Sequence, residues 1–114
     1  MIPKLTEVDR AQARFALAYA ELWPIWMTVR QQRIFAHIGD QREPTVGDVA
    51  RSLKEASGTT SRTLLDIGPR DRWGRPGALL IDSYEGVRGA RHQFVTEAGI
   101  DLLHKIAKLR QTGG

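Results

Sequence analysis

The residues that could do acid–base or metal chemistry are few and lie far apart in this chain. It has three histidines, His37, His92 and His104, and no cysteine. None of the histidines stands at metal-ligand spacing from a second histidine or a carboxylate. Without cysteine there is no thiolate ligand and no disulfide, and no glycine loop has the spacing that cradles a phosphate. These residues predict no enzyme, no metal site and no cofactor.

Arginine and hydroxyl side chains offer a different chemistry. Arg62 stands among four hydroxyl residues in the stretch 59–63, and a guanidinium there can pair with the O6 and N7 atoms of guanine. Five more arginines fall between Arg70 and Arg91, against three acidic residues. The net charge is +4 and the pI about 10.0. This balance favours a polyanionic partner, and the arginine-rich segment suits phosphate binding.

The elements that must position these side chains begin with a predicted helix-turn-helix at 45–67. Thr45 is a favourable N-cap, and apolar residues follow it at helical spacing. Residues 54–58 break the pattern, with Ser57 and Gly58 as turn and cap residues. In the second helix Thr60 shares a face with Leu64 and Ile67, and Arg62 lies on the other. The second helix of such a motif enters the DNA major groove. Two amphipathic helices at a turn also occur in proteins that read no DNA.

An arginine-rich loop and a β-hairpin are predicted after this motif. The loop 68–77 carries three arginines and Trp73. A strand at 78–83 would place Leu79 and Ile81 on one face and Leu80 on the other. A return strand at 91–95 would point Phe94 or Val95 inward, and the tip between the strands contains Arg88. A hairpin directly after the second helix is a wing, whose basic tip suits a narrow minor groove.

Helices are predicted before and after this winged module. The first spans 7–22, and Trp23-Pro24-Ile25-Trp26 ends it as a packing corner. A second helix at 29–39 begins at Thr28 and closes at Gly39. The last helix begins at Thr96 and reaches about 110. The first and last helices carry more apolar surface than so small a core can use, which indicates a homodimer.

Several short motifs, taken in their order along the chain, resemble the MarR-like family of winged-helix regulators. Met27-Thr28 with Gln31 and Ile34 is similar to that family's "LT…Q…L" helix, and 45–50 to its "T…LA" helix. Residues 59–62 resemble the "TVSR" of its DNA-reading helix. Arg91 with 95–99 resembles the "R…LTxxG" that ends its wing. The resemblance spans most of 27–106, and departs from the family pattern at Thr60 and in the loop 68–77.

Together, the element order and the resemblance predict a mainly α fold with a small β-hairpin wing (α+β), a winged helix-turn-helix dimeric through its terminal helices. One domain at 1–114 would comprise an N-terminal dimerisation helix (1–22), a DNA-binding winged module (28–95) and a C-terminal dimerisation helix (96–110). The function implied is a sequence-specific regulator of transcription, a repressor that binds double-stranded DNA at an inverted repeat as a homodimer. The alternative is a winged-helix adaptor that binds protein in replication, partition or secretion.

The predicted DNA contacts are Ser57, Thr59, Thr60, Ser61, Arg62, Thr63, Arg70, Arg72, Arg75, Arg88 and Arg91. The predicted dimer contacts are Ala11, Phe15, Ala18, Leu22, Ile100, Leu103 and Ile106. No run of 18 apolar residues and no signal peptide is visible, so we expect no membrane partner and a cytoplasmic location. The sequence leaves open whether a small-molecule effector binds.

Overall fold

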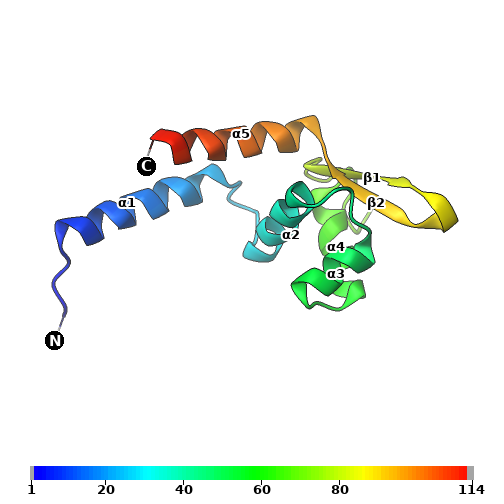
Figure 1. Ribbon diagram of the computed structural model, residues 1–114, viewed down its shortest axis with the longest axis horizontal. Helices are drawn as coiled ribbons and strands as arrows, with labels where there is room; N and C mark the ends of the chain where they lie inside the picture. Colours follow the sequence, from blue (N-terminus) through cyan, green and yellow to red (C-terminus); the bar gives the residue numbers. More distant parts are fainter. Residues whose placement is uncertain (1, 113–114) are drawn as a thin grey trace.

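The computed structural model describes residues 2–112, with side chains described up to 109. Its elements in chain order are α1 (Glu7–Leu22), α2 (Val29–Asp40), α3 (Val46–Leu53), α4 (Ser57–Ile67), β1 (Ile81–Glu85), a 3-10 turn (Val87–Gly89), β2 (Arg91–Val95) and α5 (Glu97–Thr112). Helices α2, α3 and α4 form a compact body, from which the hairpin projects on one side and α1 and α5 extend on the other (Figure 1). This confirms the predicted mainly α fold with a two-stranded wing.

Threonine caps determine where three of the helices begin. The hydroxyl oxygens of Thr6, Thr28 and Thr45 each accept a hydrogen bond from a backbone N–H three residues on, and the side chain there accepts one in return. The start predicted at Thr28 is confirmed, but Gly39 does not close α2, which runs on to Asp40. Because these caps involve only neighbouring residues, they form wherever the sequence provides them.

The turn between α3 and α4 is shorter than predicted. Lys54 adopts a left-handed conformation with φ 56°, and the Glu55 N–H donates to the Ala50 carbonyl at 2.9 Å. The chain has therefore reversed by Ala56, which makes no side-chain cap, and α4 begins at Ser57. Ser57 and Gly58 are helical residues, so the prediction that they form the turn is wrong.

The hydrophobic core lies between the three helices of the body, the base of the hairpin and the start of α5. Ile34 and Phe35 of α2 are fully buried, as is Ile81 of β1. Trp23 is buried too, and its ring meets Phe35 edge-on at a centroid distance of 6.0 Å. The packing corner predicted around Pro24 is thus half correct, because Trp26 remains 50% exposed.

The wing is an antiparallel hairpin whose register runs from Ile81 opposite Val95 to Glu85 opposite Arg91. The first strand was predicted to begin three residues earlier. Instead, the Leu79 and Leu80 N–H groups donate to the carbonyls of Gly68 and Ile67 at the end of α4. Leu79 takes φ 58° and is exposed, while Leu80 and Ile81 are both buried, so the predicted alternation fails there.

Of the two residues predicted to point inward from the return strand, Val95 does so and Phe94 does not. Gln93 is buried, Val95 is half-buried against the core, and Phe94 is exposed. The Gln93 N–H donates to the Pro44 carbonyl at 2.9 Å. One further contact, between His92 Nδ1 and the Glu43 carbonyl at 2.7 Å, ties the wing to the loop between α2 and α3. The wing is therefore held in a fixed direction relative to the helices.

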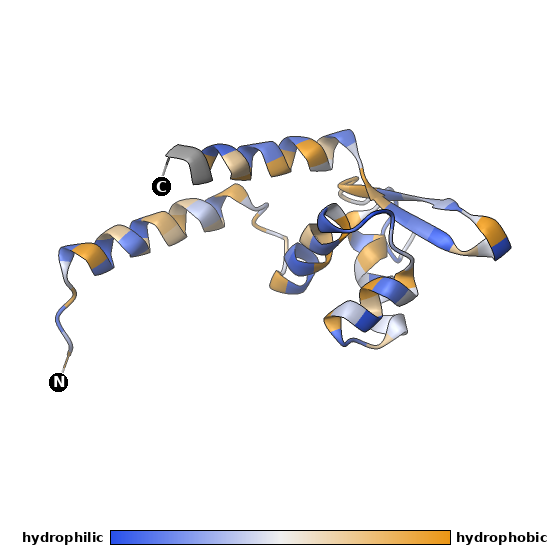
Figure 2. Ribbon diagram, viewed as in Figure 1, coloured by the Kyte–Doolittle hydropathy of each residue, from blue (hydrophilic) through white to orange (hydrophobic). Residues whose placement is uncertain are grey.

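Helices α1 and α5 contact each other outside the main body (Figure 1). No residue of α1 is buried, and hydrophobic residues are distributed along it (Figure 2). At the base of α5, Gly99 allows a close crossing, because a Cβ there would lie 2.3 Å from the Leu80 carbonyl oxygen. Across residues 2–112, no helix has the length and apolar character needed to span a membrane.

Candidate nucleic-acid interface

The outward face of α4 presents Ser61 and Arg62 to solvent, with Thr59 half-buried beside them. A surface pair between Arg62 and Asp66 would have tied up this guanidinium. Asp66 instead accepts two hydrogen bonds from Arg72, at 2.6 Å to Nη2 and 3.3 Å to Nε. Within the described part of the chain Arg62 has no ion-pair partner. Its five donors are available to a ligand.

Two of the predicted contacts on α4 lie in the interior. Thr60 is 0% and Thr63 6% exposed. The Thr63 hydroxyl donates to the Thr59 carbonyl at 3.0 Å, within its own helix. Helix α4 packs against both α2 and α3, so its buried face is wider than one apolar stripe. The prediction that Thr60 and Thr63 contact DNA is therefore wrong.

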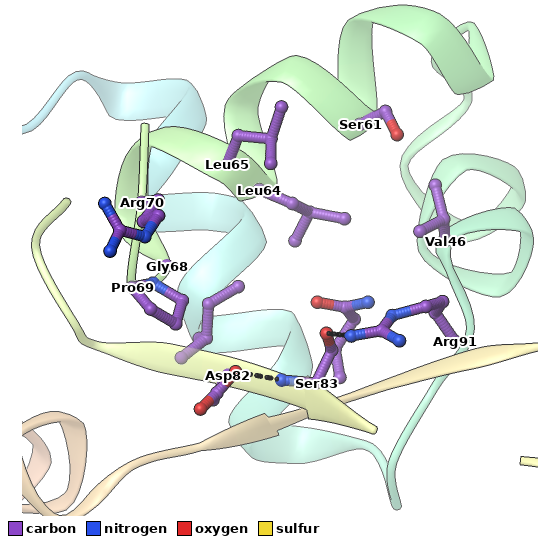
Figure 3. Close-up of a pocket in the computed structure, with 12 residues that line it drawn as sticks. Val46, Ser61, Leu64, Leu65, Gly68, Pro69, Arg70, Asp82, Ser83 and Arg91 are labelled. Carbon is purple, nitrogen blue, oxygen red and sulfur yellow. Dashed lines mark hydrogen bonds between the residues drawn. The ribbon is translucent and has the colours of Figure 1, made fainter. Parts of the chain in front are cut away.

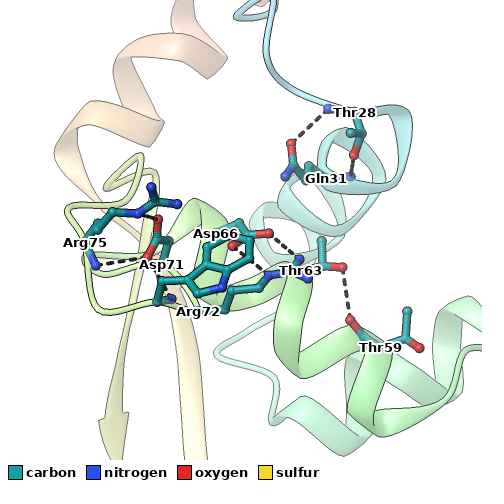
Figure 4. A network of polar contacts seen from close by, with 9 residues as sticks. Thr28, Gln31, Thr59, Thr63, Asp66, Asp71, Arg72 and Arg75 are labelled. Atoms are coloured by element: carbon teal, nitrogen blue, oxygen red, sulfur yellow. Dashed lines mark hydrogen bonds and ion pairs between the residues drawn. The ribbon is translucent and has the colours of Figure 1, made fainter.

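The arginine-rich loop is braced by its own side chains (Figure 4). Besides the Arg72–Asp66 pair, Arg75 Nε lies 3.3 Å from Asp71 Oδ2. Both guanidinium groups stack on Trp73, with their central carbons 5.2 and 5.0 Å from the ring centroid. Arg72 thus has partners in α4 and in the loop, and Arg75 has partners in the loop, which reduces what both can offer a phosphate.

A groove of about 260 Å³ separates α4 from the wing (Figure 3). Its polar lining comes from three segments: Ser61 of α4, Arg70 of the loop, and Asp82, Ser83, Arg91 and Gln93 of the two strands. Arg91 Nη2 donates to Ser83 Oγ at 3.1 Å, which holds the guanidinium over the groove. The structure therefore brings together three predicted contact residues that lie far apart in sequence.

Ser83 was missed by the sequence analysis, and only the hairpin register could have indicated it. Arg91 pairs with Glu85 along the strands, so Ser83 lies diagonally across from Arg91 on the same face. Farther out, Arg88 stands exposed in the 3-10 turn with φ 62°. The wing thus carries two exposed arginines, one beside α4 and one at the tip.

Comparison with known proteins gives matches in shape alone. No protein-family profile and no curated protein sequence matches the chain. The solved MepR–DNA complex of Staphylococcus aureus matches with a TM-score of 0.62 at 15% identity, covering 93% of this chain and 77% of that one. RV1404 of Mycobacterium tuberculosis matches with a TM-score of 0.67 at 18% identity, covering 96% and 77%. The PcaV transcriptional regulator of Streptomyces coelicolor matches with a TM-score of 0.57 at 16% identity, covering 95% and 81%.

The chain has the MarR-like winged-helix fold, which it shares with MepR, RV1404 and PcaV. Within this fold the predicted dimer contacts fall into two groups. Ala11, Phe15 and Ile100 are exposed. The others are partly buried: Leu103 and Ile106 pack against the core of the same chain, and Ala18 and Leu22 are half-buried. The exposed group lies on α1 and at the start of α5.

Proposed function

We propose that this chain is a sequence-specific regulator of transcription that binds double-stranded DNA. The observation that carries the proposal is Arg62, exposed and without an ion-pair partner among the described residues, on the outward face of α4. It stands beside a groove lined by Arg70 and Arg91. The MarR-like fold adds support, since MepR has been solved in complex with DNA.

Each basic group has a distinct place in this proposal. With α4 in the major groove, Arg62 would donate to a guanine, and Ser61 would reach a base edge or the backbone. The DNA backbone separates the major groove from the minor groove. One of its phosphates would lie in the protein's own groove between α4 and the wing. Arg70 and Arg91 would neutralise it there. Arg88 at the wing tip would enter the adjacent minor groove.

The assembly we propose is a homodimer on an inverted repeat, with α1 and α5 as the dimerisation helices on either side of the winged module in sequence. Two-fold symmetry would then place the α4 helices on half-sites about 34–36 Å apart. We further propose that the regulator represses transcription, performs no catalysis and acts in the cytoplasm. Among residues 2–112, no cluster of three His, Asp or Glu side chains is placed to hold a metal.

Selection from a random duplex library with the purified chain tests this function directly. At low salt, where phosphate contacts are strongest, recovery of an inverted repeat is expected. The Arg62→Ala variant, selected in parallel, should return a pool with less preference at one position of each half-site. If nothing is enriched at low salt, the protein-binding adaptor becomes the better description.

A further inference from the structure

Gln93 of β2 is a buried polar residue in the lining of the groove between α4 and the wing. It is only 6% exposed. Among the side chains that the structure describes, up to residue 109, none forms a hydrogen bond with its amide, and no backbone group does so either. A buried amide without a partner costs free energy in the folded chain. An external group that bonds to it would recover that cost.

The hairpin fixes the direction of this side chain. The Gln93 backbone N–H donates to the Pro44 carbonyl at 2.9 Å, and Ser83 is the residue directly opposite Gln93 in the register. Because side chains alternate along a strand, Gln93 shares its face of the wing with Arg91 and Ser83. Those two residues are joined by the hydrogen bond of 3.1 Å that holds the guanidinium over the groove.

The groove around Gln93 suits an anion. Among the described residues its charged lining consists of two guanidinium groups, from Arg70 and Arg91, and one carboxylate, from Asp82. Asp82 occupies the alternate position of β1, and its carboxylate accepts from the Ser83 N–H at 2.7 Å (Figure 3). Much of the remaining lining is apolar, and a hydrogen bond is electrostatically stronger in such surroundings than in water.

We infer that Gln93 is a third phosphate-binding residue of this groove, and that it holds the DNA backbone through an uncharged N–H donor. The inference rests on the proposed DNA-binding function, in which Arg70 and Arg91 neutralise the same phosphate. A phosphodiester has two unbridged oxygens with several lone pairs, so it can accept from an amide and from guanidinium groups together. Hydrogen bonds to an ionised oxygen are among the stronger kinds.

An uncharged donor differs from an arginine in how its contribution depends on salt. A guanidinium that binds a phosphate releases counterions, so its loss flattens the salt dependence by about one unit of slope. Loss of the Gln93 amide should instead weaken binding by a similar factor at every salt concentration. Because a backbone contact carries no sequence information, that factor should be the same on cognate and scrambled duplexes.

Two substitutions of Gln93 test the inference by fluorescence anisotropy with a scrambled duplex across a salt series. Gln93→Met keeps the length of the side chain without the amide, and should bind about tenfold more weakly with an unchanged slope. Gln93→Glu puts a carboxylate beside the phosphate and should weaken binding by roughly a hundredfold. The matched controls are Gln41→Met and Gln41→Glu, at an exposed glutamine outside the groove, which should leave binding nearly unchanged.

A double-mutant cycle separates a shared phosphate contact from an effect on the fold. If Gln93 and Arg91 bind one phosphate, Gln93→Met should weaken binding less in the Arg91→Ala background than in the parent. Thermal melts of the same four proteins are the companion measurement. The coupling should be present in the affinities for the duplex and absent from the melting temperatures.

Three results would overturn the inference. A folded Gln93→Met protein that binds the duplex as tightly as the parent would do so while leaving the proposed function intact. Weaker binding with a flattened salt slope would also do so, because Gln93 would then act through an arginine. A parent protein that binds no duplex at low salt would overturn the proposed function, and this inference with it.

Discussion

At the scale of single residues, an ion pair determines which of two arginines, Arg62 or Arg72, can bind an external group. Both guanidinium groups lie within reach of the end of α4, but Asp66 is bonded to Arg72. Arg72 is thereby drawn into the bracing of the loop, and Arg62 is left free to bind an external group. Asp66 therefore pairs with Arg72, six residues later in the chain, and not with Arg62, which lies four residues earlier at the spacing typical of ion pairs within a helix.

Replacing Arg62 by alanine should weaken binding to the cognate duplex by about 1–3 kcal/mol and relax the preference at one base position. Arg62→Lys should not restore that preference, since an ammonium cannot make two parallel hydrogen bonds to guanine. Binding isotherms on cognate and scrambled duplexes measure both effects.

Arg14→Ala is the matched control for Arg62→Ala, because Arg14 is an exposed arginine on α1, outside the winged module. It should leave the difference between cognate and scrambled duplexes intact. If Arg62→Ala binds both duplexes as the parent does, then α4 does not read bases through this residue.

At the scale of elements, α5 crosses the hairpin base so closely that only glycine fits at position 99. A Cβ there would meet the Leu80 carbonyl oxygen at 2.3 Å and Val95 Cγ1 at 2.6 Å. We expect Gly99→Ala to lower the free energy of unfolding by about 1–3 kcal/mol, as overpacking does. Urea denaturation followed by circular dichroism measures it.

Gly58→Ala is the control for the crossing at Gly99. Gly58 lies in the first turn of α4, and nothing lies within 4 Å of the Cβ it would gain. Since alanine favours helix over glycine, this variant should be unchanged or more stable by up to about 1 kcal/mol. A Gly99→Ala protein as stable as Gly58→Ala would mean that α5 can move away from the hairpin.

The free energy of unfolding depends on pH through Asp48, in the first turn of α3. The Thr45 backbone N–H donates to the Asp48 carboxylate at 3.0 Å, and this bond and others hold the pKa of Asp48 below its ordinary value of 3.8. The unfolded chain therefore binds more protons than the folded one. The contribution is complete well above pH 3.8 and is lost as the pH falls through the folded-state pKa.

Asp48→Asn should therefore lower the urea midpoint at pH 7 and converge with the parent once the pH has fallen below the folded-state pKa of Asp48, where the carboxyl is protonated in both states. Asp101→Asn, a change of the same kind beyond the first turn of α5, should show no such convergence. A gap between Asp48→Asn and the parent that is equally large at pH 7 and below that pKa would contradict the assignment.

At the scale of the whole molecule, α1 is a helix that packs little of its surface against the rest of the chain. It buries no residue, and Phe15, Leu17 and Tyr19 remain 40% exposed or more. In proteins most of the stability of a helix comes from the packing of its apolar face, and the contact with α5 covers only part of the apolar surface of α1. A second copy of the chain would supply the missing cover.

Phe15→Glu should therefore convert a dimer into a monomer in sedimentation at micromolar concentration. It should also reduce binding of the inverted repeat to that of a single half-site, while leaving the winged module folded. Ala13→Glu introduces the same side chain at an exposed position on the opposite face of α1 and should leave the assembly unchanged. If the parent protein sediments as a monomer both with and without DNA, the proposed homodimer is wrong.

The sequence by itself determined those features that depend on neighbours along the chain. The starts of α2 and α3 follow from the caps at Thr28 and Thr45, each of which closes over three residues. The outward position of Arg62 follows from the helical period that turns Leu64 and Ile67 inward. The return strand at 91–95 was also bounded correctly.

Tertiary structure alone decided what depends on partners distant in sequence. Thr60 and Thr63 are buried because two helices pack on α4, and β1 begins late because residues 79–80 bond to the end of that helix. Ser61, Arg70 and Arg91 share one groove only because the hairpin folds back beside α4. Local periodicity carries no information about such contacts, since they depend on which elements meet in space.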